Sequence, residues 1–160
     1  MPKIANKTLV VYYSRTGTTR MLGEAIAKAL KCDSEELIDK KSRKGILGWL
    51  KAGFEAGRKK LTKINPIKSN LDKYTLVLVG TPIWAANISP ATRTFLAENK
   101  NKFKNVAFFA TYGSDAGKCY ENMEAVCRKK PVGCFGMTTK QVRSGDYGKG
   151  FRDYIKNLKA

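Results

Sequence analysis

Apolar and polar residues follow two different rhythms along the chain. Short continuous apolar runs predict buried strands, and apolar residues that recur every three or four positions predict amphipathic helices. The predicted strands are residues 8–13, 35–38, 76–80, 106–110 and 132–137, and the predicted helices are residues 18–30, 90–99, 120–127 and 151–158. Strands that are apolar throughout are typical of parallel sheets covered on both faces. Five strands that alternate with helices therefore predict a doubly wound α/β fold.

Residues 39–68 break this rhythm. They hold 10 Lys or Arg residues against two acidic residues, a net charge of +8. One face of a helix predicted within them carries Ile46, Leu50, Phe54, Gly57 and Leu61, although the glycines weaken that helix. Two interpretations are open. This basic amphipathic insert covers the sheet between the second and third strands, or it contacts a partner or ligand with Trp49 as an exposed anchor. The second interpretation includes a homodimer that forms through residues 45–61.

Length and composition narrow the class of protein. The chain has 160 residues, of which 42% are hydrophobic, and this predicts one domain over residues 1–160 with a substantial core. No apolar run approaches the roughly 20 residues that a membrane span needs. Charged Lys3 and Lys7 interrupt the first apolar residues, unlike a signal peptide. We therefore expect a soluble, cytoplasmic protein.

Charge and residue types restrict the chemistry. The net charge of +18 attracts anions such as nucleic acid, acidic proteins, membrane headgroups or phosphorylated ligands. Histidine is absent, which excludes His-based triads and most catalytic zinc sites. The cysteines, at positions 32, 119, 127 and 134, match no metal or redox spacing. We predict reduced structural thiols and no metal site.

The first strand is followed by a turn rich in hydroxyl groups, residues 14–20, with the sequence SRTGTTR. The next helix begins near Thr18, so its unpaired N–H groups and positive dipole end face this turn. Gly17 allows the chain to turn tightly. Converging donors of this kind suit a phosphate monoester, although hydroxyls that merely cap the helix are the alternative. No GxGxxG or GxxxxGK[ST] motif is present to indicate a dinucleotide or a nucleoside triphosphate.

Two further turns follow the third and fourth strands. Residues 81–90 (TPIWAANISP) place Trp84 where its ring could stack on a planar ligand or cap the core, and Asn87 where it could bind a heterocycle edge. Residues 111–115 (TYGSD) offer close backbone approach at Gly113 and a second ring at Tyr112. Ligands of open parallel sheets bind beyond the carboxyl ends of the strands. The three turns together therefore predict a planar heterocycle on a phosphorylated polyol.

The same turns carry a family resemblance. The motifs YYSRTGTT (residues 12–19), GTPIWAANISPATRTFL (residues 80–96) and FFATYG (residues 108–113) resemble those of the flavodoxin family, and the resemblance extends over about residues 7–158. It implies a flavodoxin-like three-layer sandwich with a five-stranded parallel sheet of order 2-1-3-4-5. It also implies FMN bound at the switch between the first and third strands.

The resemblance assigns cofactor-binding roles by position. The residues implied to hold the FMN phosphate are Ser14, Thr16, Gly17, Thr18 and Thr19, with Arg15 at a variable position among them. The residues implied to line the ribityl chain and one ring face are Thr81, Pro82, Ile83, Trp84 and Asn87. The residues implied to meet the pyrimidine edge or the other face are Thr111, Tyr112, Gly113 and Ser114. Thr18 stands where many family members have asparagine.

The function implied by the resemblance is electron transfer by bound FMN, with no residue acting as an acid–base catalyst. The expected partner of the basic surface is an acidic redox protein such as a ferredoxin. Familiar flavodoxins are acidic, so the charge of this chain departs from the family pattern, and we expect a less negative potential for the second electron. An FMN-dependent NAD(P)H or quinone oxidoreductase is the alternative. A basic module for nucleic acid or membrane surfaces is less favoured, because no nucleic-acid motif appears.

Overall fold

The computed structural model describes residues 7–41, 47–48, 50–51, 54 and 61–159. Its elements are β1 (Thr8–Tyr12), α1 (Thr18–Leu30), β2 (Asp33–Glu36), η1 (Leu71–Lys73), β3 (Leu76–Trp84), β4 (Asn87–Ile88), α3 (Pro90–Asn99), β5 (Val106–Tyr112), α4 (Cys119–Cys127), β6 (Cys134–Thr138), α5 (Thr139–Ser144) and α6 (Gly148–Lys159). The main strands form a parallel sheet of order β2-β1-β3-β5-β6, and β4 pairs antiparallel with the end of β3. This confirms the predicted fold class and strand order, with β4 as an addition.

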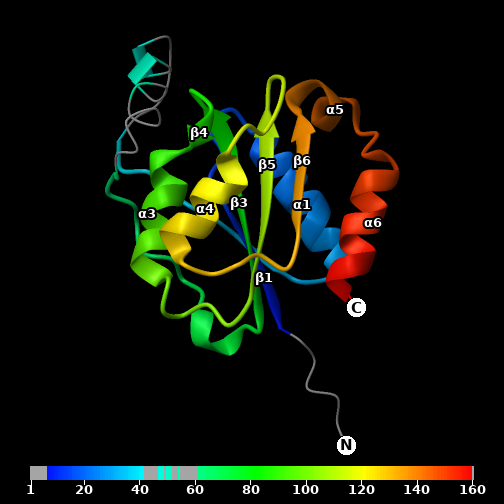
Figure 1. The fold of residues 1–160 in the computed structure, drawn as a ribbon, viewed down its shortest axis with the longest axis horizontal. Coiled ribbons are helices and arrows are strands. Elements are labelled where there is room, and N and C mark those ends of the chain that lie inside the picture. The colour runs from blue at the N-terminus through cyan, green and yellow to red at the C-terminus, as the bar shows by residue number, and fades with distance from the viewer. Residues whose placement is uncertain (1–6, 42–46, 49, 52–53, 55–60, 160) are drawn as a thin grey trace, which may run out of the picture.

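Helices cover both faces of the sheet. Figure 1 shows α3 and α4 on one face, and α1, α5 and α6 on the other. Each face has its own apolar core. Phe108 of β5 packs in the core that includes Phe95 of α3, whereas its neighbour Phe109 packs in the core that includes Leu22 of α1. Successive strand residues point to opposite faces, so an uninterrupted apolar strand serves both cores.

The predicted bounds hold best where local signals are strong. Helix α1 spans residues 18–30 as predicted, and α3 begins at Pro90 with the side chain of Ser89 as its N-cap. Strand β2 lies two residues earlier than predicted and has the polar sequence DSEE. It is an edge strand that pairs only with β1, so its residues need not be apolar. Strand β3 extends four residues beyond the predicted Gly80, because the chain folds back through β4.

Helix α5 was not predicted from the apolar periodicity. This helix has only six residues, too few for a repeating apolar pattern, and it begins with a capping box in which Thr138 and Gln141 bind each other's backbone N–H groups. Gly145 ends it in the left-handed conformation, with φ of 77°. No helix within the described residues is long and apolar enough to cross a membrane.

The basic insert is described only in part. At its two ends Asp39 and Ile64 form an antiparallel bridge, and the backbone N–H of Thr62 donates to Thr94 Oγ1 on α3 at 2.9 Å. These contacts tie the two ends of the insert to each other and its second end to α3. Trp49 and most of residues 45–61, and with them the predicted anchor and homodimer contact, lie outside the described residues.

Candidate functional site

The three turns chosen from the sequence meet at one edge of the sheet. Strands β1, β3 and β5 are parallel neighbours, so the turns that follow them lie together at their carboxyl ends. Thr19 Oγ1 in the first turn lies 2.8 Å from Thr111 Oγ1 in the third, a buried hydrogen bond. The rings of Tyr13 and Trp84 meet edge to face with centroids 5.6 Å apart, which joins the first turn to the second.

The first turn, residues 14–20, leaves the start of α1 open. Gly17 has φ of 96°, and within the described residues no heavy atom beyond its chain neighbours lies within 4 Å of the place that a Cβ would occupy there. No side chain among the described residues caps α1, and the N–H of Met21 makes the first helical bond, to the carbonyl of Gly17 at 3.0 Å. The N–H of Gly17 itself donates to Ser14 Oγ at 3.1 Å. The first-turn N–H groups of α1 thus face an open bend in the chain.

The hydroxyls of the first turn are used in different ways. Thr16 is exposed, whereas Thr18 and Thr19 are buried. Thr19 is bound to Thr111, and Thr18 Oγ1 accepts a hydrogen bond from Arg143 Nη2 at 3.3 Å. The structure therefore offers the backbone N–H groups and Thr16 to a ligand more directly than the two buried hydroxyls.

The two arginines of the first turn lie toward β2 and the residues that follow it. Arg20 donates from Nε and Nη2 to both carboxylate oxygens of Glu36 at 2.9 Å, and this hydrogen bonding raises the pKa of Arg20. Arg15 is half-buried and lines a cavity of about 430 Å³ with Tyr13, Ser14 and residues that follow β2. Arg15 thus lies on the β2 side of the turn.

The second turn, residues 81–90, is closed by its own hydrogen bonds. Thr81 is fully buried, and its Oγ1 accepts from the N–H of Ser89 at 3.0 Å and donates to the carbonyl of Pro82 at 2.8 Å. Asn87 is 6% exposed, and its side-chain oxygen accepts three hydrogen bonds from within the protein. Pro82, Ile83 and Trp84 are half-buried, so they are the predicted residues of this turn whose side chains remain accessible.

Only part of the third turn, residues 111–115, contacts the other two turns. Gly113 and Ser114 are exposed, but Thr111 is buried against Thr19. The ring of Tyr112 lies over Gly136 of β6, where any Cβ would collide with it. Burial raises the pKa of Tyr112. Tyr112 therefore packs toward β6, and its predicted role as a cover for a second ring face stays a prediction.

Two arginines near these turns were missed by the sequence reasoning. Arg143 on α5 reaches Thr18 in the first turn, and Arg93 on α3 donates from Nη2 to Asn87 Oδ1 at 2.9 Å beneath the second. A sequence signal existed for the first. The pattern Thr138, Gln141 and Gly145 marks a short capped helix that places Arg143 in its last turn. No local pattern marks Arg93, because its partner comes from a different element.

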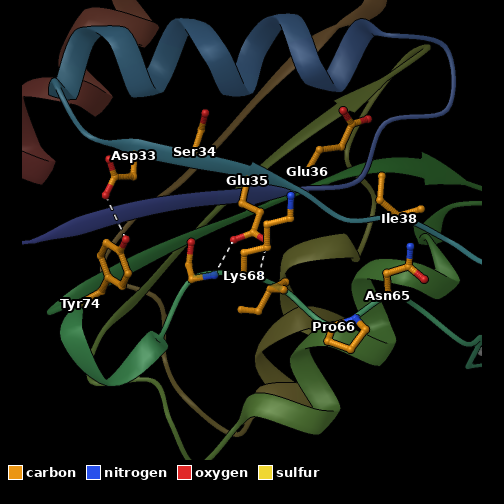
Figure 2. A pocket seen from close by; sticks show the side chains of 11 residues that line it. Asp33, Ser34, Glu35, Glu36, Ile38, Asn65, Pro66, Lys68 and Tyr74 are labelled. Carbon is orange, nitrogen blue, oxygen red and sulfur yellow. Dashed lines mark hydrogen bonds between the residues drawn. The ribbon is translucent and has the colours of Figure 1, made fainter.

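A larger cavity, of about 710 Å³, lies away from these turns along the outer edge of β2. Figure 2 shows it between β2 and residues 65–69. Its carboxylates already have partners in the chain: Asp33 accepts from the hydroxyl of Tyr74 at 3.0 Å, and Glu35 accepts from the N–H groups of Lys68 and Ser69. Cavity size alone therefore does not select the site, and the strand ends remain the better candidate.

Comparison with known protein families settles the relationship. The family model for flavodoxin matches residues 7–134. The chain belongs to the flavodoxin family. No match is found among curated proteins.

Several solved structures share the fold of this chain. A flavoprotein from Lactobacillus acidophilus, solved in complex with FMN, is 22% identical over 91% of this chain and 100% of its own, with a TM-score of 0.72. Two-electron reduced flavodoxin from Megasphaera elsdenii is 15% identical over 96% of this chain and 99% of its own, with a TM-score of 0.63. A flavodoxin, WrbA-like protein from Agrobacterium tumefaciens is 19% identical over 78% and 73%, with a TM-score of 0.53. At these identities the likeness concerns the fold.

Proposed function

We propose that this protein binds FMN across the three turns and transfers electrons to and from it. The observation that carries the proposal is the open start of α1 at Gly17, placed beside Trp84 and the third turn at the carboxyl edge of the sheet. Membership of the flavodoxin family and the FMN complex of the Lactobacillus flavoprotein support the same ligand.

The residues present fit a phosphate monoester. An anion at the N-terminus of a helix is bound by unpaired N–H groups and by the positive end of the helix dipole. The N–H groups at the start of α1 have no side-chain cap among the described residues, the exposed Thr16 adds a hydroxyl, and Arg143 stands at the turn through its bond to Thr18. Arg20 is not needed in this arrangement, because it is paired with Glu36.

The remaining contacts orient the ring system. Pro82, Ile83 and Trp84 present half-buried side chains beside the first turn, and the exposed backbone at Gly113 allows close approach from the third. When bound, FMN supplies reversible one- and two-electron chemistry, and the protein supplies position and electrostatics. The ring of Trp84 packs edge to face against Tyr13, a contact that favours one orientation of the indole.

The partner follows from charge. A net charge of +18 steers and holds an acidic redox protein such as a ferredoxin, and such an attraction weakens as salt screens it. We therefore propose an electron carrier with a basic docking surface, in contrast to acidic flavodoxins.

Titration of the purified protein with FMN and with riboflavin, which lacks the phosphate, tests the proposal. We expect FMN to bind about tenfold or more tightly than riboflavin, because only FMN fills the open start of α1. Reduced FMN-loaded protein should pass electrons to a ferredoxin at a rate that falls as salt rises. A protein that cannot be reconstituted with FMN refutes the proposal, and rapid reduction by NADPH alone replaces the carrier with an NADPH-dependent oxidoreductase.

A further inference from the structure

Arg93 is a buried cation that has no anionic partner among the residues that the structure describes. Arg93 is 7% exposed, and its Nη2 atom donates a hydrogen bond to the neutral amide oxygen of Asn87 at 2.9 Å. Its Nε atom is buried without any hydrogen-bond partner in the described part of the chain. Burial lowers the pKa of Arg93, but a guanidinium titrates so far above neutral pH that it stays charged. An unpaired buried charge is costly, so its retention calls for a physical reason.

The oxygen that faces Arg93 is crowded with donors. Asn87 Oδ1 accepts three hydrogen bonds. The donors are Arg93 Nη2 at 2.9 Å, the backbone N–H of Ile88 at 2.9 Å and Asn122 Nδ2 at 3.1 Å. A carbonyl oxygen has two lone pairs, whereas a carboxylate has about four acceptor sites and a full charge. The hydrogen-bonding pattern therefore suits a carboxylate, yet the chain has an amide there and leaves the guanidinium uncompensated.

Two ionisable groups on neighbouring segments do not neutralise Arg93. Cys119, at the start of α4, interacts electrostatically with Arg93, but burial raises the pKa of this thiol to about 12, so it is uncharged near neutral pH. Asp115 lies on the exposed third turn, where its carboxylate accepts from the N–H of Gly117 at 2.8 Å and from Ser114 Oγ at 3.3 Å. The N-terminus of α3, which has no acidic residue in its first turn, adds further positive potential.

The cluster supports the turn that carries Trp84. Asn87 pairs with Trp84 across β3 and β4, and the two residues between them, Ala85 and Ala86, have φ of 47° and 59°. Alanine is strained in this left-handed region, and such strain persists only where the surroundings hold it. The hydrogen bonds to Asn87 from α3 and α4 provide that hold.

We propose that Arg93 is a positioning residue that fixes the turn of Trp84 and places an uncompensated positive charge beneath it, so that FMN bound there is easier to reduce. The inference rests on the proposed function. A fixed positive charge favours whichever state of its neighbour carries more electrons. The asparagine at position 87 preserves this effect, because an aspartate there would cancel the charge of Arg93.

The substitution Asn87→Asp isolates the charge. It keeps an oxygen that can accept all three hydrogen bonds, changes the size of the side chain little and pairs Arg93 with a carboxylate. Arg93→Met removes the charge, and Arg93→Lys keeps it. Asn157→Asp on the exposed face of α6 is the matched control, with the same chemical change away from the turns.

Potentiometry of the FMN-loaded proteins gives the main readout. For Asn87→Asp and Arg93→Met we expect the ratio of reduced to oxidised protein at a fixed potential to fall about tenfold, a shift of about 59 mV toward more negative values for one electron. Arg93→Lys and Asn157→Asp should stay near the wild-type potential. A merely structural role for Arg93 would leave the potential of Arg93→Met near that of the wild type, whereas an added carboxylate lowers the potential of Asn87→Asp by its own charge as well. An unchanged potential in either variant therefore overturns the proposal.

Thermal unfolding of the FMN-free proteins provides an independent arm. Asn87→Asp should unfold at a higher temperature than the wild type, since it pairs a buried charge, whereas Asn157→Asp should not. A lower unfolding temperature for Asn87→Asp would show that Arg93 is already compensated and would overturn the inference. Failure of the wild type to bind FMN refutes the proposed function instead. If Arg93→Met does not fold, Asn87→Asp alone decides.

Discussion

The first and second turns of the candidate site are built from similar residues but use them in opposite ways. Both combine threonine and serine hydroxyls at the end of a buried strand. In the first, no side chain in the described part of the chain caps the start of α1, and Gly17 has open space at its Cβ position. In the second, Ser89 caps α3, and its hydroxyl lies 2.8 Å from that of Thr92 and within hydrogen-bonding distance of Thr81.

The difference shows that residue type does not decide whether a polar group serves the fold or a ligand. The second turn runs through β4 directly into α3, so its hydroxyls are needed to satisfy the buried backbone there. The first turn is a short bend that is partly exposed at Thr16, and its helix begins without a side-chain cap from the described residues. We infer that the two turns have different roles: the closed turn holds Trp84 in place, and the open turn binds the phosphate.

The largest expected effect comes from a substitution that disrupts the closed turn. Ser89→Ala removes the N-cap of α3 and leaves the N–H of Thr92 without its side-chain acceptor. We expect the free energy of unfolding to fall by about 2–3 kcal/mol, from the lost cap and the poorly satisfied buried hydroxyls. Urea unfolding of the FMN-free protein measures this. Ser34→Ala on the exposed face of β2 is the control, expected to change stability by less than about 0.5 kcal/mol. Equal losses in both variants would mean that the hydroxyl cluster contributes nothing.

An intermediate effect is expected from a substitution that distorts the open turn. Gly17→Ala adds a Cβ to a residue that has a positive φ, at a place where the described residues leave open space. The expected loss of about 1–2 kcal/mol in the free energy of unfolding therefore arises from the backbone conformation alone. Relief of that strain shifts the N–H groups at the start of α1, and we expect FMN affinity to fall about tenfold. Gly148→Ala has the matching geometry, with φ of 67° and open space, at the start of α6.

The pair of glycine variants separates binding from folding. Both should lose similar stability in urea unfolding, but only Gly17→Ala should lose FMN affinity in a fluorescence titration. Wild-type affinity in Gly17→Ala would show that the phosphate is not held at this bend.

The fold was largely predictable because its signals are local. The apolar spacing of α1 and the Ser89 and Pro90 signal of α3 fix where these helices begin. Strand β2 was misplaced because an edge strand need not be apolar, and α5 was missed because six residues do not establish a period.

The site was predictable only as far as topology reaches. Parallel strand order brings the three turns together, so their convergence follows from the sequence pattern. Which side chains stay available does not follow. Thr19 is bound to Thr111, 92 positions away, and Asn87 is bound by Arg93 and Asn122 from two helices. Contacts between distant elements therefore decide which predicted ligands are accessible, and no local motif contains that information.

The smallest expected effect sharpens the comparison by testing whether the open turn also uses a charge. Arg143→Gln removes the guanidinium that donates to Thr18 Oγ1. Because Arg143 is exposed, stability should change by less than about 0.5 kcal/mol. A partly screened charge beside a phosphate contributes about 1 kcal/mol, so FMN affinity should fall about fivefold at low salt and riboflavin affinity should not change. Arg152→Gln on α6 removes an equally exposed charge and should leave both affinities unchanged. Equal weakening of FMN by both variants would assign the effect to the overall positive field and leave the backbone N–H groups of α1 to hold the phosphate alone.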